Sequence, residues 1–136
     1  MSKVNGKVAV ITGATGGIGF AVAKRLGKDG YTVILNGLNA EEGAVKVEEL
    51  IADGITAEFY AFDVTNEDEV NENIKKIGEK YGKIDVVVNN AGGLGGRSRF
   101  EEMTTEFYRS VMALNLDSTF FVSRAAIPYL KKGENA

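Results

Sequence analysis

Short apolar runs alternate along this chain with segments whose apolar residues recur every three or four positions. The runs cover residues 7–12, 31–36, 56–62 and 84–89. They are rich in β-branched residues, as is typical of strands buried in a sheet. The segments between them, about 17–29, 39–53 and 66–81, have the spacing of amphipathic helices. The alternation predicts right-handed strand–helix–strand units and an α/β fold with a parallel sheet.

Local signals predict where these helices begin and end. Asn39 precedes the second helix, with Glu42 at the capping-box position, and Gly82 ends the third. The inner stripe of the second helix is expected at Ala44, Val47 and Ile51, and that of the third at Val70, Ile74, Ile77 and Tyr81. From about residue 104 to residue 132 the pattern predicts one or two helices. Their expected inward residues are Phe107, Val111 and Leu114, with Pro128 positioned to kink the last helix.

The composition is that of a soluble globular protein with one domain, residues 1–136. Hydrophobic residues make up 44% and charged residues 26% of the chain. The net charge of −3 gives no general attraction to nucleic acid or to an anionic membrane. No apolar run approaches the ~20 residues of a membrane span. The start of the chain, Met1 to Lys3, leads almost directly into a strand, so we expect no signal peptide and a cytoplasmic location.

The absence of cysteine and histidine limits the chemistry. The chain has no cysteine, which excludes disulfides, thiolate nucleophiles and cysteine-ligated zinc. It also has no histidine, which excludes a Ser-His-Asp triad and most transition-metal catalysis. The acidic groups read as solvated faces and first turns of helices, so we expect no metal site. Acid–base chemistry must come from tyrosine, lysine or carboxylates.

The first apolar run leads directly into a glycine-rich turn and then a helix. Gly13, Gly16, Gly17 and Gly19 lie in this turn. A strand, a glycine turn and a helix start present backbone N–H groups to a phosphate. Gly13 would let the chain leave the strand sharply, Gly17 would admit a diphosphate, and Gly19 would let the helix approach the sheet. The alternative is a β–α turn that only packs.

Four motifs in order resemble the short-chain dehydrogenase/reductase family. They are Thr12-Gly13-x-x-x-Gly17-Ile18-Gly19, Asp63-Val64 after the third strand, Asn89-Asn90-Ala91-Gly92 after the fourth, and Asn115 within Ala113–Leu116. The resemblance implies a Rossmann-type three-layer sandwich, with a four-stranded sheet in the order 3-2-1-4 and helices on both faces. The general likeness is to the 3-oxoacyl-carrier-protein reductase and sugar dehydrogenase branches.

The resemblance also implies a dinucleotide site. The pyrophosphate would be held at the glycine turn and helix start, by Gly13, Thr15, Gly16, Gly17, Ile18 and Gly19. Asp63 would accept from the adenine amino group, with the Val64 N–H nearby. The ribose and nicotinamide would be lined by Asn90, Ala91 and Gly92.

Two asparagines have alternative interpretations. Asn115 matches the helix asparagine of the family's catalytic tetrad, which holds a water of the proton relay. Its alternative is a buried helix asparagine satisfied by local carbonyls. For Asn89 we favour a structural role, in which its amide ties neighbouring strands with help from Thr12.

The cofactor, NAD or NADP, is chosen at the end of the second strand, where an acid would bind the ribose 2′-OH. Here the candidates are Asn36 and Leu38, within Asn36-Gly37-Leu38-Asn39. The acid that favours NAD is missing, and so is an arginine that would hold a 2′-phosphate. The neutral end of the second strand would not repel the 2′-phosphate of NADP, but it offers no cation to attract it, so it favours NADP slightly.

The resemblance covers only the first half of the family's catalytic domain, because the sequence ends where a fifth strand is expected. The family's catalytic serine, and a tyrosine followed four residues later by a lysine, lie beyond that strand. None of the five tyrosines here has a lysine four residues on. The family moves a hydride between a nicotinamide and the carbonyl or alcohol carbon of a small molecule. We expect this chain to carry the cofactor half only and to be inactive alone.

Two further expectations follow from the sequence. The apolar fourth strand, Val86 to Val88, would lack a neighbour on one side, which favours a homo-oligomer. The main alternative function is a non-catalytic nucleotide-binding module. A methyltransferase-like domain would need an acid at the second strand end, and a flavodoxin-like signalling domain would need an acidic or phosphate-binding cluster in place of the first glycines.

Overall fold

The computed structural model describes residues 5–136, so the predicted leader-free start at Met1 to Lys3 lies outside the described part. The four strands are β1 (Val8–Ile11), β2 (Thr32–Gly37), β3 (Ala57–Ala61) and β4 (Val86–Val88). They form one parallel sheet in the order β3-β2-β1-β4. The predicted fold class and strand order are therefore confirmed.

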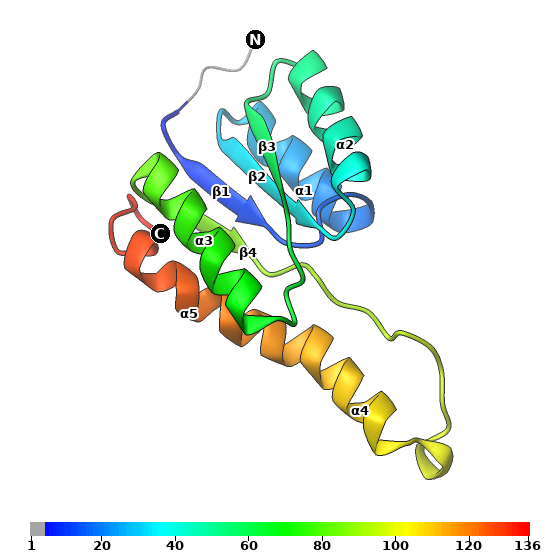
Figure 1. Cartoon of the computed structure of the whole chain (residues 1–136). Helices are drawn as coiled ribbons and strands as arrows, with labels where there is room; N and C mark the ends of the chain where they lie inside the picture. Colours follow the sequence, from blue (N-terminus) through cyan, green and yellow to red (C-terminus); the bar gives the residue numbers. More distant parts are fainter. Residues whose placement is uncertain (1–4) are drawn as a thin grey trace.

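Helices cover both faces of this sheet (Figure 1). They are α1 (Gly17–Lys28), α2 (Ala40–Ala52), α3 (Glu67–Tyr81), α4 (Thr105–Met112) and α5 (Ser118–Leu130). A short 3₁₀ turn spans Phe100–Glu102, and a π-helical turn, Ala113–Asp117, joins α4 to α5. Pro128 lies inside α5, which continues two residues beyond it.

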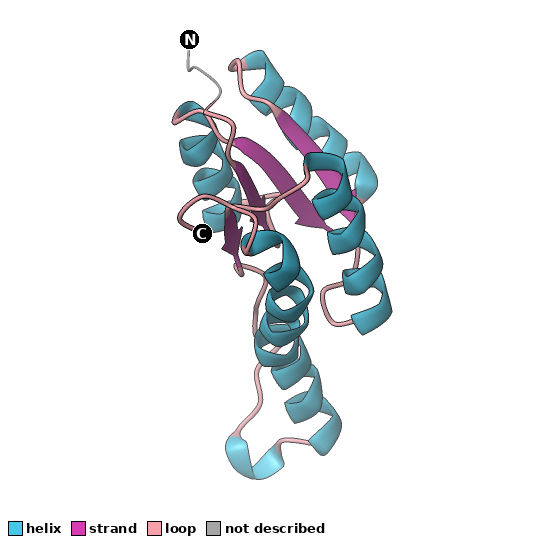
Figure 2. Cartoon of the chain, turned by 90° about the vertical axis from the view of Figure 1, so that its left-hand side faces the viewer, coloured by secondary structure: helices cyan, strands magenta, loops and turns pink. Residues whose placement is uncertain are grey.

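Alternate residues of the central strand feed two separate cores. Val8 and Val10 pack with α3 and α5 on one face, whereas Ala9 and Ile11 pack with α1 and α2 on the other. Side chains of a strand point to opposite faces in turn, which explains why a continuous apolar run is required here. The sheet is thus the middle layer of a three-layer sandwich (Figure 2).

The predicted inner stripe of α2 is wrong by one position. Gly43 and Leu50 are buried, whereas Ala44 and Ile51 are exposed and Val47 is half-buried. A Cβ at position 43 would overlap the ring of Phe59, so the glycine allows the helix to lie against β3. The prediction used only the spacing of apolar residues, so it overlooked Gly43 as a contact residue.

β4 is shorter and more exposed than the sequence predicts. Its three valines are half-buried rather than enclosed on both faces. The cause is its place in the sheet, because β4 pairs with β1 and forms one edge.

A second glycine-rich loop, residues 92–96, follows β4. The segment from this loop to the end of α4, residues 92–112, projects away from the sheet as an arm (Figures 1 and 2). Phe107, Val111 and Leu114, expected to face inward, are only half-buried, and α4 has no buried residue. Phe100 at the far end is 90% exposed. The apolar residues of α4 are thus only partly covered within residues 5–136.

Candidate functional site

The turn after β1 is shaped by Gly13. Its φ of +59° lies in the left-handed region, and a Cβ there would lie 2.9 Å from Ala91 Cα. Both demands exclude a side chain at this position. The turn is also held from the side of β2, because the Gly13 N–H donates to Asn36 Oδ1 at 3.1 Å and the Ala14 N–H to the Asn36 carbonyl at 2.8 Å. The predicted sharp exit from the strand is confirmed.

α1 begins without a side-chain cap from any residue that the structure describes. Gly16 occupies the N-cap position in an extended conformation, and the first turn contains no acidic residue. Gly17 has a φ of +56°, and a Cβ on it would meet open space. Gly16, Gly17 and Ile18 are exposed. The first N–H groups of α1 are therefore accessible to an anion from outside.

Asn90 ties the end of β4 to the end of β1. Its side-chain amide donates to the carbonyls of Thr12 at 3.1 Å and Gly13 at 2.9 Å. In return, Thr12 Oγ1 accepts from the backbone N–H groups of Asn90 and Ala91, both at 3.0 Å. A Cβ at Gly19 would overlap this Asn90 amide, so the predicted close approach of α1 to the sheet is also confirmed.

The strand tie that the sequence assigned to Asn89 is therefore wrong. The Asn89 amide donates to Ser123 Oγ on α5 at 3.0 Å, and Asn90 takes the role instead. Successive residues at a strand end point to opposite faces, and a one-residue shift exchanges their partners.

The Asn36 side chain is bonded within the scaffold. It is 2% exposed. Its amide donates to the carbonyls of Phe62 at 2.9 Å and Tyr60 at 3.4 Å, while its Oδ1 accepts from Gly13. It joins the ends of β1, β2 and β3, a role that its position at the strand end did not reveal.

A cavity of about 370 Å³ lies at the carboxyl ends of the strands. Its lining includes nine of the predicted cofactor residues, namely Gly13, Thr15, Asn36, Leu38, Asp63, Val64, Asn90, Ala91 and Gly92. Gly37, Asn39, Glu42, Phe62 and Leu114 complete the lining. Gly16 to Gly19 are not part of it but form the start of α1 beside it. Ligands of open α/β folds bind at this edge of the sheet.

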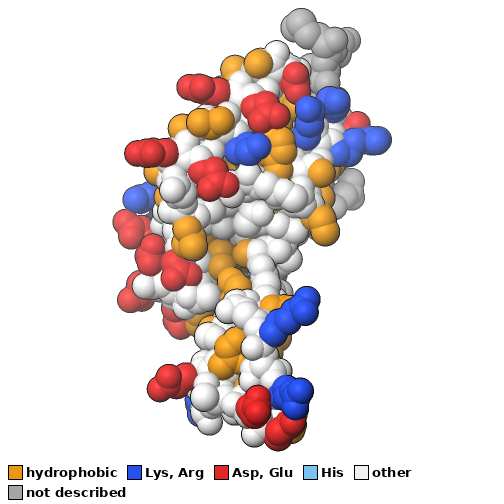
Figure 3. Space-filling model, turned by 90° about the vertical axis from the view of Figure 1, so that its right-hand side faces the viewer, with side chains coloured by type: hydrophobic (Ala, Val, Ile, Leu, Met, Phe, Trp, Pro, Cys, Tyr) orange, Lys and Arg blue, Asp and Glu red, His pale blue; other side chains and the backbone are white. Residues whose placement is uncertain are grey.

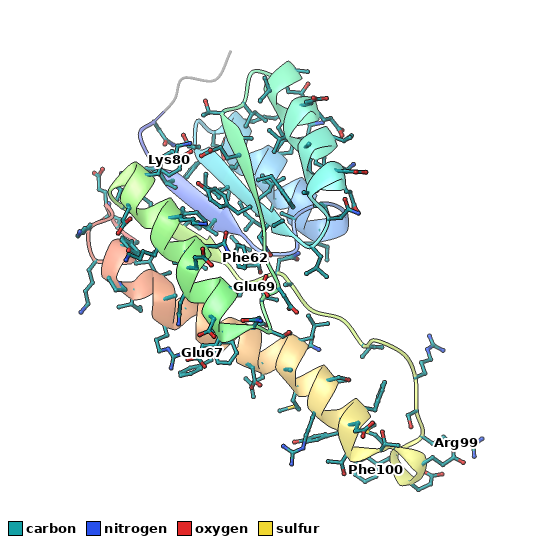
Figure 4. The ribbon with its side chains drawn as sticks, in the orientation of Figure 1. Phe62, Glu67, Glu69, Lys80, Arg99 and Phe100 are labelled. Carbon is teal, nitrogen blue, oxygen red and sulfur yellow. The ribbon has the colours of Figure 1, made fainter. Side chains whose placement is uncertain are left out.

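The view in Figure 3 is from the right-hand side of Figure 1, in which the strand arrows point downward and to the right. Apolar side chains and white surface lie between the sheet body and the arm in this view. Figure 4 places Phe62 near Glu69, just beyond the end of β3, whereas Arg99 and Phe100 lie at the far end of the arm. Arg99 is thus remote from the cavity.

Asp63 is oriented by its own loop. Its Oδ1 accepts from the backbone N–H of Thr65 at 2.8 Å and from the Thr65 hydroxyl at 2.7 Å. This turn holds the carboxylate in the wall of the cavity, which is compatible with the expected contact to an adenine amino group.

Asn115, in the π-helical turn between α4 and α5, ties that turn to Gly93 of the glycine-rich loop. Its amide donates to the carbonyls of Gly93 at 2.6 Å and Val111 at 2.9 Å, and its Oδ1 accepts from the Gly93 N–H at 3.0 Å. It lies in the π-helical turn. Helical irregularities of this kind are common at functional sites. The predicted alternative, a buried helix asparagine, is wrong in one respect, because Asn115 is exposed; the bond to the Val111 carbonyl is the local contact it anticipated.

Glu42 is the charged residue of the cavity wall that the sequence interpretation missed. The sequence identified it only as part of a capping box, and the structure confirms that the Glu42 N–H donates to Asn39 Oδ1 at 3.0 Å. The same first turn of α2 places Glu42 in the lining. Its spacing, one helical turn beyond the end of β2, was the available signal.

Asp85 stabilises the opposite end of the sheet. Its side chain accepts from the N–H groups of Val8 and Glu134, each at 2.8 Å, and pairs with Lys83 at 3.0 Å. Burial alone would raise the pKa of Asp85, but these two amide bonds and the Lys83 ammonium outweigh burial and lower it. The carboxylate fixes where β4 starts beside β1.

Two absences concern residues 5–136 alone. That part of the chain contains no group of three or more aspartates or glutamates arranged to hold a metal ion. None of its helices combines the length and apolar character needed to cross a membrane.

Comparison with known proteins agrees with this geometry. A model of the short chain dehydrogenase family matches residues 7–136. The chain belongs to the short-chain dehydrogenase family.

Curated relatives include enzymes with different substrates. A 3beta-hydroxysteroid dehydrogenase of Mediterraneibacter gnavus is 40% identical over 136 residues, which is all of this chain and 49% of the relative. A 3-oxoacyl-[acyl-carrier-protein] reductase of Thermotoga maritima is 36% identical over 135 residues, 98% of this chain and 54% of the relative. The chain spans about half the length of the curated relatives it matches.

Solved structures share the fold. A metagenomic short-chain oxidoreductase in complex with NADP superposes with a TM-score of 0.87 at 34% identity, covering 95% of this chain and 58% of that one. An actinorhodin polyketide ketoreductase variant with NADPH gives a TM-score of 0.86 at 35% identity, covering 93% and 48%.

Proposed function

We propose that this chain is the cofactor-binding portion of an NAD(P)-dependent oxidoreductase acting on a carbonyl or alcohol group of a small molecule. The observation that carries the proposal is the uncapped start of α1 beside the cavity at the carboxyl ends of the strands. Exposed N–H groups at a helix start favour a diphosphate. Membership of an enzyme family that binds NAD(P) supports the same reading. When bound, the nicotinamide would accept or donate the hydride.

The residues present fit such a group. Amides of the glycine turn would hold the diphosphate, with Gly13, Thr15, Gly16, Gly17, Ile18 and Gly19 as its contacts. Asp63 would accept from the adenine amino group and the Val64 N–H would donate beside it. Asn90, Ala91 and Gly92 would line the ribose and nicotinamide, with Asn90 fixed by its bonds to the Thr12 and Gly13 carbonyls. The open space above Gly17 supports this fit, because a ligand can approach the backbone there.

For the choice of cofactor we propose that NADP is accepted. The support is the neutral end of β2, where Leu38 and Asn39 line the cavity and no acid occupies residues 36–39. Two structural neighbours were solved with NADP or NADPH. This end supplies no cation, so the preference over NAD is expected to be slight.

For catalysis this chain supplies Asn115 as its one match to the family's tetrad. We propose that it holds the glycine-rich loop and supports the proton relay of a whole enzyme. The chain as printed has no tyrosine followed four residues later by a lysine. We therefore expect that it binds cofactor but does not turn over substrate.

The test is a titration of the purified chain with NADPH, followed by nucleotide fluorescence, and then an absorbance assay with added ketone substrates. Saturable binding without steady loss of NADPH is the expected result. An absence of saturable binding would contradict the nucleotide site. Steady oxidation that depends on a ketone would contradict the predicted inactivity and leave the site intact.

Assembly and location remain predictions from the sequence. A homo-oligomer is supported by the free edge of β4 and by the exposed apolar residues of the arm, such as Phe100 and Tyr108. A monodisperse monomer in light scattering would count against it. Residues 1–136 as one incomplete domain, and a cytoplasmic location, are likewise proposals.

A further inference from the structure

The charges around the cavity have one sign. Glu42 and Asp63 are its charged lining residues, and no lysine or arginine of the described chain lines it. Lys46, on the same helix as Glu42, lies over the Phe20 ring and pairs with Glu49 instead. A ligand that carries extra negative charge into this cavity meets two carboxylates and no compensating cation.

The two carboxylates differ in how they are held. Asp63 accepts two hydrogen bonds from Thr65, which fix it and offset part of its charge. The Glu42 carboxylate makes no hydrogen bond or ion pair with any of residues 5–136; only its backbone N–H is used, by Asn39. Glu42 is therefore the acid that is free to interact with a bound molecule.

The position of Glu42 relates it to one part of a dinucleotide. In folds of this kind an acid about 20 residues beyond the glycine turn meets the ribose 2′-OH at the end of the second strand. Here Gly37 has no side chain and Leu38 and Asn39 are uncharged, so the strand end itself offers no acid. Glu42 follows in the first turn of α2 and shares the cavity wall with Leu38 and Asn39.

We infer that Glu42 determines how strongly this site discriminates between NAD(H) and NADP(H). The inference rests on the proposed function. A 2′-phosphate brings up to two negative charges to the wall that Glu42 occupies, whereas a 2′-OH brings a hydrogen-bond donor that its carboxylate accepts. Repulsion across several ångströms of partly hydrated space corresponds to a loss of about tenfold in affinity. Glu42 thus opposes the slight preference for NADP that the neutral strand end creates.

The experiment compares dissociation constants for NADH and NADPH in the whole chain and in Glu42→Gln. Glutamine keeps the size and a hydrogen-bond acceptor but removes the charge. NADPH is expected to bind about three- to tenfold more tightly to the variant, with NADH changed less than twofold. Glu42→Lys is expected to strengthen NADPH binding further. The gain is expected to shrink at high salt, because the interaction lies at a partly exposed wall.

Glu41→Gln is the matched control. Glu41 is exposed, lies in the same first turn of α2 and does not line the cavity, so its loss changes net charge and helix-end electrostatics equally. An equal gain in NADPH affinity in this control, or an unchanged NADPH-to-NADH ratio in Glu42→Gln, would overturn the role of Glu42. If the unaltered chain binds neither nucleotide, the proposed function fails and the inference fails with it. Circular dichroism confirms that the variants are folded.

Discussion

Three helices begin at the same edge of the sheet, and the first begins unlike the other two. α2 and α3 are capped by Asn39 and Asn66, which accept from backbone N–H groups three residues on, at 3.0 and 3.1 Å. Both carry acidic residues in the first turn. α1 starts at Gly16 with neither a cap nor an acid. The chain satisfies two helix starts internally, and the third, which has no such partner, is the proposed anion site.

The difference is not one of architecture, because all three helices follow parallel strands in the same way. It is produced by residue choice at a few positions. Glycines keep the backbone of α1 bare, and neutral amides of Asn36 and Asn90 hold the surrounding strand ends. The contacts of Asn36 and Asn90 that join these strand ends therefore add no charge beside the proposed diphosphate site. A helix start that lacks a cap is therefore a candidate anion site.

The largest expected effect is at Gly13. Gly13→Ala combines a left-handed φ with a contact to the Ala91 backbone. We therefore expect the free energy of unfolding to fall by about 2–3 kcal/mol, and nucleotide binding to be lost. Urea unfolding and NADPH titration measure both. Gly54→Ala is the matched control, because Gly54 also has a positive φ, of +80°, but a Cβ there would be in open space. Its cost is expected near 1 kcal/mol with binding unchanged. Equal losses of stability in the two variants would show that the close approach of Gly13 to the Ala91 backbone is unimportant.

A carboxylate does tie strands at the other end of the sheet, which sharpens the contrast. The two oxygens of Asp85 accept from two backbone N–H groups, and Asp85→Asn replaces one of these oxygens by an NH₂ group that faces a donor. We expect the free energy of unfolding to fall by about 1–3 kcal/mol at neutral pH. Because the folded-state pKa of Asp85 is lowered, its contribution is present above the unfolded pKa of about 3.9 and is lost as pH falls through the folded pKa. Urea unfolding between neutral and acidic pH should show the gap between wild type and variant closing only at the acidic end. A stability difference that does not change with pH would show that the Asp85 charge is not its cause.

The smallest effect on stability, with a clear effect on binding, is expected from giving α1 the cap that its neighbours have. Gly16 is extended and a Cβ on it would be in open space, so Gly16→Asp should cap α1 and raise stability by roughly a few tenths of a kcal/mol. The added carboxylate should lower NADPH affinity by tenfold or more. Asn66→Asp places the same charge at the start of α3, away from the cavity, and should leave binding within twofold. Tighter NADPH binding in Gly16→Asp would refute the proposed anion site.

Much of this fold was predictable because local signals and global pattern agree. The β1 run, the glycine turn and the capping residues Asn39 and Gly82 each have short-range causes. The errors lie where a long-range contact decides. The face of α2 depends on Gly43 meeting Phe59, and the strand tie falls to Asn90 because its amide reaches the Thr12 and Gly13 carbonyls.

Patterns along the chain were enough to predict the order of elements, the parallel sheet and the family, because periodicity, turn residues and ordered motifs are local properties. The packed structure was needed to show that Asn36 bonds within the scaffold, that Asn115 holds Gly93, and that Glu42 lines the cavity. These roles depend on distances between residues far apart along the chain, or on the direction in which a helix turns after a strand. Such distances exist only once the layers have packed.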